Sequence, residues 1–243
     1  MQFHAPLIEG RLVKRYKRFM ADIILSDGSQ ITAHCANSGS MLGLKETGSR
    51  VWVSHHDDPK RKLKYTWQLV EADGALVGIN TQHPNTLVTE GIENGTISAL
   101  SGYSSLRREV KYGKNSRIDI LLEDDTRPKC YVEVKNVHLM RSVGLAEFPD
   151  SVTARGAKHL IELGDMVEQG YRAVMVYLVQ RSDCNHFKVA ADIDFKYAAA
   201  LQQARVRGVE AVVYDCHITH QEITVRGTLA SDLLEDTGAP GGD

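Results

Sequence analysis

The chain has 243 residues, of which 42% are hydrophobic and 25% are charged, and its formal net charge is −2. This composition is typical of a globular protein and excludes a disordered chain. No apolar run approaches the roughly 18 residues of a membrane helix, and the N-terminal residues lack the pattern of a signal peptide. The four cysteines lack metal-ligand spacing, so we expect free buried thiols and a cytoplasmic protein.

The first 80 residues predict a small β-barrel. Short strand-forming segments alternate there with turn signals such as Asp27-Gly28 and Asp73-Gly74, because Asp and Gly tolerate the positive φ of tight hairpins. Five or six strands in so short a segment favour an oligonucleotide-binding (OB) barrel. We therefore assign residues 1–82 to an OB-like barrel, a candidate nucleic-acid-binding domain. The expected strands are 7–16, 19–25, 30–35, 50–54, 63–70 and 75–79.

From residue 83 onward, helices alternate with strands. A first helix, three strands, a second helix and a buried strand follow one another, which is the order of a restriction-endonuclease-like (PD-(D/E)xK) domain. We assign residues 83–230 to an α/β (α+β) domain of this kind, and the acidic residues 231–243 to a flexible tail. The expected helices are 85–95, 153–169 and 194–207, and the expected strands are 104–112, 116–123, 130–137, 172–180, 209–214 and 221–227.

Two acids and a lysine on adjacent predicted strands form a candidate catalytic site. Glu133 and Lys135 are two residues apart, so their side chains leave the strand on the same face, roughly 7 Å apart along the chain. Asp119 lies on the face opposite to Ile118 and Ile120. If the two strands pair, two carboxylates and one ammonium group meet at one place.

Asp119 and Glu133 are the predicted metal ligands. Mg²⁺ prefers one or two carboxylates together with waters and a substrate phosphate, and Mn²⁺ is the alternative cofactor. A bound cation polarises a phosphoryl oxygen and lowers the pKa of a bound water. Lys135 would orient that water and stabilise the developing negative charge. The competing interpretation is an ordinary cross-strand ion pair on a solvated sheet face.

Three further residues of this domain are candidates. Glu90 lies beside the apolar face of the first helix and is a candidate fourth catalytic residue, or equally a solvated acid. Arg155 and Lys158 lie with His159 on the polar side of the second helix, near its N-terminus. Cations oppose the helix dipole at that end, and a bound phosphate would remove this conflict. The alternative is a solvated helix face.

Basic residues alternate with aromatic residues in the barrel, where residues 1–80 contain 11 Lys and Arg against 8 Asp and Glu. This pattern suits a nucleic-acid backbone, because cations neutralise phosphates and rings stack on bases. Tyr65 and Trp67 fit a barrel core slightly better than a stacking surface. His55-His56-Asp57-Asp58 predicts no metal site, because neighbouring loop residues point in different directions. The candidate DNA-binding residues here are Arg15, Lys17, Arg18, Lys60, Arg61, Lys62 and Lys64.

Segments along nearly the whole chain resemble the sugar fermentation stimulation protein A (SfsA) family. The resemblance implies an OB-like barrel followed by a nuclease-like domain, DNA binding without sequence preference, and a regulatory role in sugar (maltose) metabolism in bacteria. The matching segments are Asn37-Ser38-Gly39-Ser40-Met41, the strand that holds Asp119, residues 131–137, residues 148–160 beginning Phe148-Pro149-Asp150, and Asp192-Ile193-Asp194.

Three hypotheses follow for the function. The first is a DNA-binding protein without sequence preference whose nuclease-like metal site serves binding. The second is an active Mg²⁺-dependent nuclease that hydrolyses phosphodiester bonds through Asp119, Glu133 and Lys135. The third is a protein-interaction module. The acidic net charge argues against very tight DNA binding. RNA stays open as a ligand, a membrane partner is not expected, and buried strands near the end of the chain would allow a homodimer.

Overall fold

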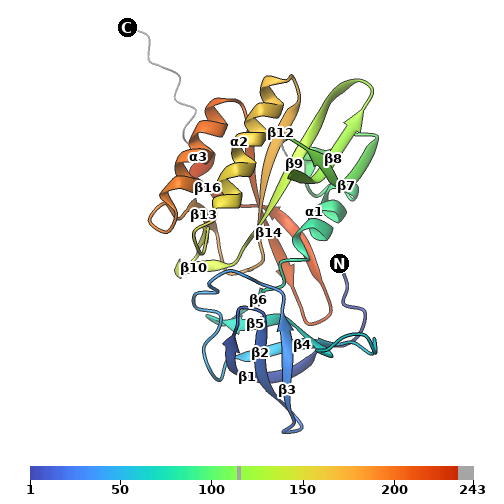
Figure 1. The fold of residues 1–243 in the computed structure, drawn as a ribbon, viewed down its shortest axis with the longest axis vertical. Coiled ribbons are helices and arrows are strands. Elements are labelled where there is room, and N and C mark those ends of the chain that lie inside the picture. The colour runs from blue at the N-terminus through green and yellow to red at the C-terminus, as the bar shows by residue number, and fades with distance from the viewer. Residues whose placement is uncertain (114–115, 235–243) are drawn as a thin grey trace.

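The computed structural model describes residues 1–113 and 116–234 of the chain. A β-barrel and an α/β domain are stacked end to end, with the barrel at the bottom of Figure 1. The last barrel strand ends at Gly78 and the first helix begins at Pro84, so a short connection joins the two parts. No helix among the described residues is long and apolar enough to cross a membrane.

Five of the six strands form a barrel that is closed by a parallel pairing of the third and fifth strands, and the sixth strand pairs with the fifth. Apolar residues such as Leu12, Ile23 and Trp67 are fully buried inside it, as the alternating pattern predicts. Asp73 and Gly74 both have positive φ in the two-residue turn between the last two strands, which is the expected hairpin geometry. The strands are β1 (Ile8–Tyr16), β2 (Met20–Leu25), β3 (Gln30–Cys35), β4 (Arg50–His55), β5 (Tyr65–Ala72) and β6 (Ala75–Gly78).

The α/β domain is built on a six-stranded sheet with the order β15-β14-β12-β9-β8-β7, in which β12 runs parallel to both of its neighbours. A second, four-stranded sheet has the order β10-β11-β13-β16. The elements are α1 (Pro84–Glu93), η1 (Ser98–Leu100), β7 (Ser105–Tyr112), β8 (Ser116–Asp124), β9 (Arg127–Val137), β10 (Leu139–Ser142), β11 (Leu145–Phe148), α2 (Ala154–Glu168), β12 (Arg172–Val179), β13 (His186–Val189), α3 (Phe195–Val206), β14 (Glu210–Ile218), β15 (Ile223–Thr228), β16 (Ala230–Ser231) and η2 (Asp232–Leu234).

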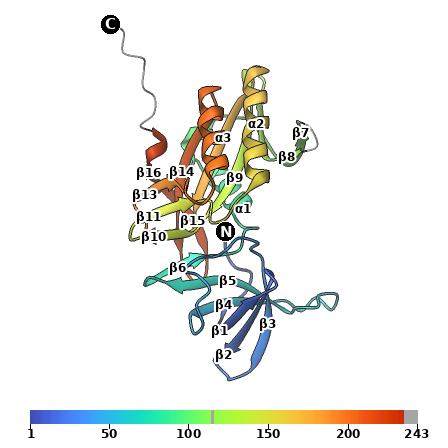
Figure 2. The ribbon, with the colours of Figure 1, turned by 60° about the vertical axis from the view of Figure 1, so that its left-hand side comes forward.

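Both faces of the large sheet are covered. Helices α2 and α3 lie side by side on one face (Figure 2), where Leu160 and Leu201 join a core with Met175 of β12. Helix α1 covers the other face, where Leu87 packs with Val174. Because β12 is buried on both faces, its sequence is continuously apolar rather than alternating. This arrangement confirms the predicted OB barrel and restriction-endonuclease-like domain.

The barrel is attached to the α/β domain by packing and by an ion pair of the buried Arg181. Trp52 and Leu69 leave the barrel core and join the α1 side of the second domain. Arg181 is 1% exposed, and its guanidinium donates to Asp183 at 2.7 Å and to Asp73 of the barrel at 3.0 Å. Asp183 is the more buried partner of Arg181, whereas Asp73 is 56% exposed, so the Asp73 contact adds to the packing between the domains but is partly screened by solvent.

Three details differ from the sequence-based expectations. The second sheet was not predicted, because its strands have only two to four residues and little alternation. His159, expected on the polar side of α2, is 4% exposed, whereas the apolar side chain of Ile161 on the same helix is 54% exposed. Residues 231–234 of the expected flexible tail belong to β16 and η2, and residues 235–243 lie outside the described residues.

Candidate functional site

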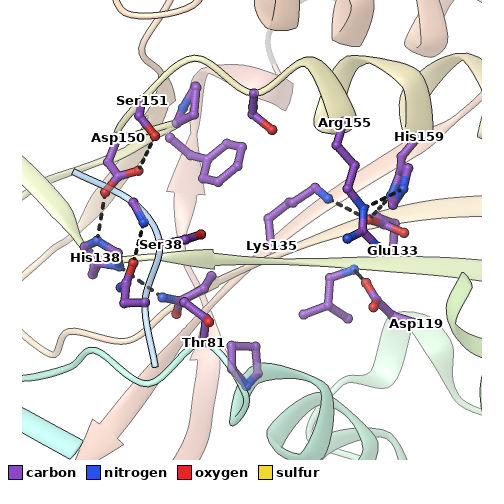
Figure 3. A pocket seen from close by; sticks show the side chains of 18 of the residues that line it. Ser38, Thr81, Asp119, Glu133, Lys135, His138, Asp150, Ser151, Arg155 and His159 are labelled. Atoms are coloured by element: carbon purple, nitrogen blue, oxygen red, sulfur yellow. Dashed lines mark hydrogen bonds and ion pairs between the residues drawn. The ribbon is translucent and has the colours of Figure 1, made fainter. Parts of the chain in front are cut away.

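A cavity of about 380 Å³ lies where the two domains meet. Its walls come from the barrel loop at residues 37–39, the start of α1, strands β8 and β9, and the segment that leads into α2. Figure 3 shows two groups of side chains in it: Asp119, Glu133 and Lys135 with the start of α2 on one side, and His138 with Asp150 on the other. The predicted catalytic triplet therefore opens into a cavity that both domains line.

Asp119 lies where strands β8 and β9 stop pairing regularly. The ladder reaches Ile120 opposite Val132, and one residue further the Asp119 carboxylate accepts the backbone N–H of Val134 at 2.8 Å. The expected alternation breaks at this point, because Ile118 packs on the α2 side of the sheet while Ile120 packs on the α1 side. Because β8 and β9 no longer pair regularly beyond Ile120, the side chains of Asp119 and Glu133 can both face the cavity.

Glu133 is 2% exposed and has an unusual set of partners. Its Oε1 accepts from Lys135 Nζ at 2.6 Å and also from His159 Nδ1. Its Oε2 is buried and has no hydrogen-bond partner among the described residues. Burial alone would raise the pKa of Glu133, but the Lys135 charge and the His159 hydrogen bond outweigh it and lower the pKa. The carboxylate is therefore ionised with one oxygen unused.

Asp119 responds in the opposite direction. Burial, followed by the negative charge of Glu133, raises the pKa of Asp119 despite hydrogen bonds from Val134 and Asn85. Asn85 donates to Asp119 Oδ1 at 2.8 Å. Because each carboxylate disfavours the ionised form of the other, a cation between them would stabilise both.

These residues fit a divalent cation. Two carboxylates are the protein contribution that Mg²⁺ prefers, and the buried Glu133 Oε2 is an acceptor that lacks a donor. Among the described residues, no group of three or more His, Cys, Asp or Glu side chains is arranged to hold a metal ion. A cation here would therefore depend on Asp119 and Glu133 together with water and ligand oxygens.

The helix residues of the site differ from those that the sequence suggested. The Glu90 carboxylate accepts from the Met1 ammonium at 2.6 Å and lines another cavity, so the structure does not bring it to Asp119 and Glu133. Asn85, the first residue of the expected helix, fills the place on α1 beside Asp119, and the helix cap is His83. A side chain five residues before the expected one, and on a different face of α1, therefore faces the carboxylates.

His159 was expected on the polar face of α2, but it is buried against Glu133. Its Nε2 accepts from Arg155 Nε at 3.3 Å, so the proton lies on Nδ1, which donates to Glu133. The contacts from Arg155 to His159 and from His159 to Glu133 hold the Glu133 side chain from the α2 side of the sheet. Its position in the segment that resembles the SfsA family was the signal that could have identified it.

The predicted DNA-binding cations fall in separate places. Arg155 is exposed and lines the cavity, and Lys158 Nζ lies 3.2 Å from Ser116 Oγ and 3.5 Å from Glu162. In the barrel, Lys17 and Arg18 form the exposed β1–β2 turn, and Arg15 donates to the backbone carbonyls of Asn37 at 2.8 Å and Gly39 at 3.0 Å. Arg15 therefore supports the loop that lines the cavity.

The second basic cluster lies in the loop between β4 and β5, away from Asp119. Lys60 and Lys62 are exposed, Arg61 donates to Thr66 Oγ1 at 2.8 Å, and Lys64 donates to the carbonyl of Asp58 at 2.7 Å. The neighbouring Trp67 is 0% exposed in the barrel core, as the favoured interpretation predicted.

Asp150, which the sequence did not single out as a site residue, joins the loop at residues 37–41 to the α/β domain. Its carboxylate accepts from the backbone N–H of Met41 at 3.0 Å and from His138 Nε2 at 3.3 Å, and its carbonyl accepts from Ser40 Oγ at 2.6 Å. A Cβ on Gly39 would lie 2.5 Å from Asp150 Oδ2, so only glycine fits there. Two segments with family resemblance thus meet in one cavity wall.

Comparison with known proteins agrees with these observations. Residues 13–79 match the SfsA N-terminal OB domain, and residues 82–222 match the sugar fermentation stimulation protein RE domain. A sugar fermentation stimulation protein homolog from Rhodospirillum centenum is 61% identical over 229 residues, which are 94% of this chain and 98% of that protein. One from Paramagnetospirillum magneticum is 58% identical over 235 residues, or 97% and 99% of the two chains.

The solved structure of Pyrococcus furiosus SfsA in complex with Ca²⁺ is also similar, with a TM-score of 0.86 and 26% identity, and the match covers 96% of this chain and 98% of that one. Both parts of the chain and its overall arrangement therefore agree with one family. The chain belongs to the sugar fermentation stimulation protein (SfsA) family, as its sequence predicted.

Proposed function

We propose that the chain binds DNA without sequence preference in the cavity between its domains, and that Asp119 and Glu133 hold a divalent cation, Mg²⁺ or Mn²⁺, there. The observation that carries the proposal is the buried Glu133 Oε2, which lacks a donor beside a second carboxylate in an open cavity. The Ca²⁺ in the Pyrococcus furiosus relative supports a divalent cation in this fold.

The residues around the carboxylates suit a phosphate backbone. Lys135 is 15% exposed and provides an ammonium group at the cavity, and Arg155 provides a guanidinium that can bind phosphate oxygens in a bidentate manner. The loop at residues 37–39 supplies the opposite wall from the barrel. A cation bound at the carboxylates would place positive charge beside a phosphoryl oxygen and would lower the pKa of a water molecule bound to the cation. DNA held between the domains would therefore meet cations on the side of the carboxylates.

The second candidate function is hydrolysis of phosphodiester bonds by an active Mg²⁺-dependent nuclease. Lys135 favours it, because its Nζ lies 2.6 Å from Glu133 Oε1 and can stabilise charge on a phosphate beside the carboxylates. In this function Asp119 and Glu133 are the metal ligands and Lys135 is the catalytic cation. The name of the relatives supports a regulatory role in sugar metabolism, for which binding without cleavage is sufficient.

Calorimetric titration with Mg²⁺, Mn²⁺ and Ca²⁺ tests the cation site. The wild type should bind one cation, and Asp119→Asn or Glu133→Gln should abolish binding. Glu90→Gln is the matched control, because Glu90 lies in another cavity and its loss should leave binding unchanged. Equal binding by the wild type and Glu133→Gln would rule out this site.

Binding of two unrelated DNA duplexes and one single strand tests the ligand. Affinities should be similar for both sequences and should fall steeply between about 50 and 200 mM salt. Incubation of the same DNA with Mg²⁺ or Mn²⁺ separates binding from cleavage, since cleavage must disappear in Asp119→Asn. Binding without cleavage supports the first function, and the absence of both contradicts the proposal.

A further inference from the structure

A second and larger cavity, of about 960 Å³, lies on the other side of the start of α1. It is enclosed by the outer surface of strands β3, β4 and β5, the loop after β4, the connection into α1, and the N-terminal residues. Its volume is in the range of small-molecule sites, roughly 300–1,000 Å³. Half of the ten histidines of the chain line it: His4, His34, His55, His56 and His83.

A chain of hydrogen bonds crosses the wall of this cavity from α1 to the barrel. Asn80 Nδ2 lies 2.8 Å from Gln68 Oε1 and 3.1 Å from His83 Nε2. Gln68 Nε2 donates to Ser54 Oγ at 2.8 Å, and Ser54 Oγ lies 3.0 Å from His56 Nε2. Because the Asn80 amide NH₂ group is a donor, His83 Nε2 accepts, and the proton of the neutral His83 ring lies on Nδ1. The Ser54 hydroxyl can donate to His56 Nε2 or accept from it, so both tautomers of His56 fit this chain.

Three of these histidines, His34, His56 and His83, are neutral near pH 7. Burial lowers the pKa of His83 to about 4, and burial followed by the charge of Arg61 lowers the pKa of His34 and of His56. Neutral imidazoles offer one donor and one acceptor each, together with an aromatic face. The wall therefore presents hydrogen-bonding edges and rings rather than a field of positive charge.

One guanidinium provides the positive charge of the cavity. Arg61 donates to Thr66 Oγ1 at 2.8 Å and forms no ion pair with any residue that the structure describes. The acid on the cavity wall, Glu90, is already paired with the Met1 ammonium. Rings also meet here, since the ring centroids of Phe3 and His83 are 6.0 Å apart. Arg61 is thus available to an anionic ligand.

We propose that this cavity binds a nucleobase together with its phosphate. A base matches neutral donors and acceptors with its edge and aromatic rings with its face, and a phosphate matches the guanidinium of Arg61. A free sugar has no aromatic face, and inorganic phosphate would leave the neutral wall unused. The base can belong to a free mononucleotide or to a nucleic-acid strand, and this site is distinct from the Asp119 and Glu133 site.

Calorimetric titration of the full chain with adenosine, the four nucleoside monophosphates, inorganic phosphate and a short single-stranded oligonucleotide tests the proposal. Arg61→Ala should weaken monophosphate binding about tenfold, the loss of one charge-assisted hydrogen bond, and leave adenosine binding unchanged. Lys62→Ala is the matched control, because it removes one cation from the same loop but Lys62 does not line the cavity. It should change the affinity less than twofold.

The remaining outcomes distinguish a free mononucleotide from a nucleic-acid strand, and this cavity from the Asp119 and Glu133 site. An oligonucleotide that binds at least about tenfold tighter than any monophosphate, with both affinities lowered by Arg61→Ala, identifies a strand. A monophosphate that binds at least about tenfold tighter than the oligonucleotide identifies a free nucleotide. Asp119→Asn should leave monophosphate affinity unchanged, so a failure of the metal site does not affect this result. Absence of monophosphate binding at millimolar concentration, or equal losses in Arg61→Ala and Lys62→Ala, would overturn the proposal.

Discussion

Replacing Asp150 by Asn should weaken the connection between the barrel loop and the α/β domain by a pH-dependent amount. Burial alone would raise the pKa of Asp150, but hydrogen bonds from His138 and the backbone of Met41 lower it to about 2. The unfolded chain has a pKa of 3.8 for this group. The difference corresponds to about 2.5 kcal/mol of stability at 1.36 kcal/mol per pKa unit. The side chain is 15% exposed, so solvent screens it little.

The sign of the effect determines the assay. The folded pKa lies below the unfolded pKa, so the carboxylate stabilises the fold above about pH 4, and this stabilisation is lost as the pH falls toward 2. Asp150→Asn should therefore lower the free energy of unfolding by about 2 kcal/mol at pH 7 and by much less near pH 2.5. Urea denaturation of the wild type and the variant at several pH values measures the difference.

Asp192→Asn is the matched control for this experiment. Its hydrogen bond to Arg141 likewise lowers the pKa of Asp192 to about 2, but the side chain is 63% exposed. Because solvent and salt screen an exposed pair, Asp192→Asn should destabilise the protein far less than Asp150→Asn. A loss in Asp150→Asn that is the same at pH 7 and pH 2.5, or no larger than the loss in Asp192→Asn, would refute this reasoning.

Three further changes test other parts of the structure. Ca²⁺ or Mg²⁺ should raise the melting temperature of the wild type and of Glu90→Gln but not of Glu133→Gln, as calorimetry can measure. Burial lowers the pKa of His83 from 6.5 to about 4, so stability should fall as the pH drops through this window, by up to about 3 kcal/mol, and urea denaturation should find no such loss in His83→Gln. Gly39→Ala should force the barrel loop away from Asp150, which limited proteolysis at residues 37–41 would detect, whereas an unchanged cleavage pattern would contradict the close approach.

The order of helices and strands was predictable because it depends on local patterns. Alternating apolar residues and turn pairs such as Asp73-Gly74 placed the barrel strands within about two residues of their observed limits. The continuous apolar run in β12 correctly predicted a strand buried on both faces. The short strands β10 and β16 were missed, because two to four residues carry too little pattern and pair only through tertiary contacts.

The spacing of Glu133 and Lys135 was enough to place both on one strand face, but not to choose their neighbours. Whether α1 offers Asn85 or Glu90 to the carboxylates depends on how the helix is rotated against the sheet. The rotation is set by the packing of Leu87 and Val88 against sheet residues in the α1-side core. A helical projection shows which residues share a face of the helix, but not how that face is oriented against the sheet. His159 was misplaced for the same reason, because α2 turns a different stripe toward the sheet than its most apolar residues suggested.

By itself, the sequence determined the strand and helix pattern, the fold class, the family and the Asp119, Glu133 and Lys135 triplet, because strand periodicity, turn chemistry and motif spacing are local properties. Only the tertiary structure decided which side chains surround that triplet. Asn85 meets Asp119 across 34 positions, His159 meets Glu133 across 26, and Asp150 meets Met41 across 109. Contacts at such separations follow from the packing of the two domains, which brings together residues that no local pattern links.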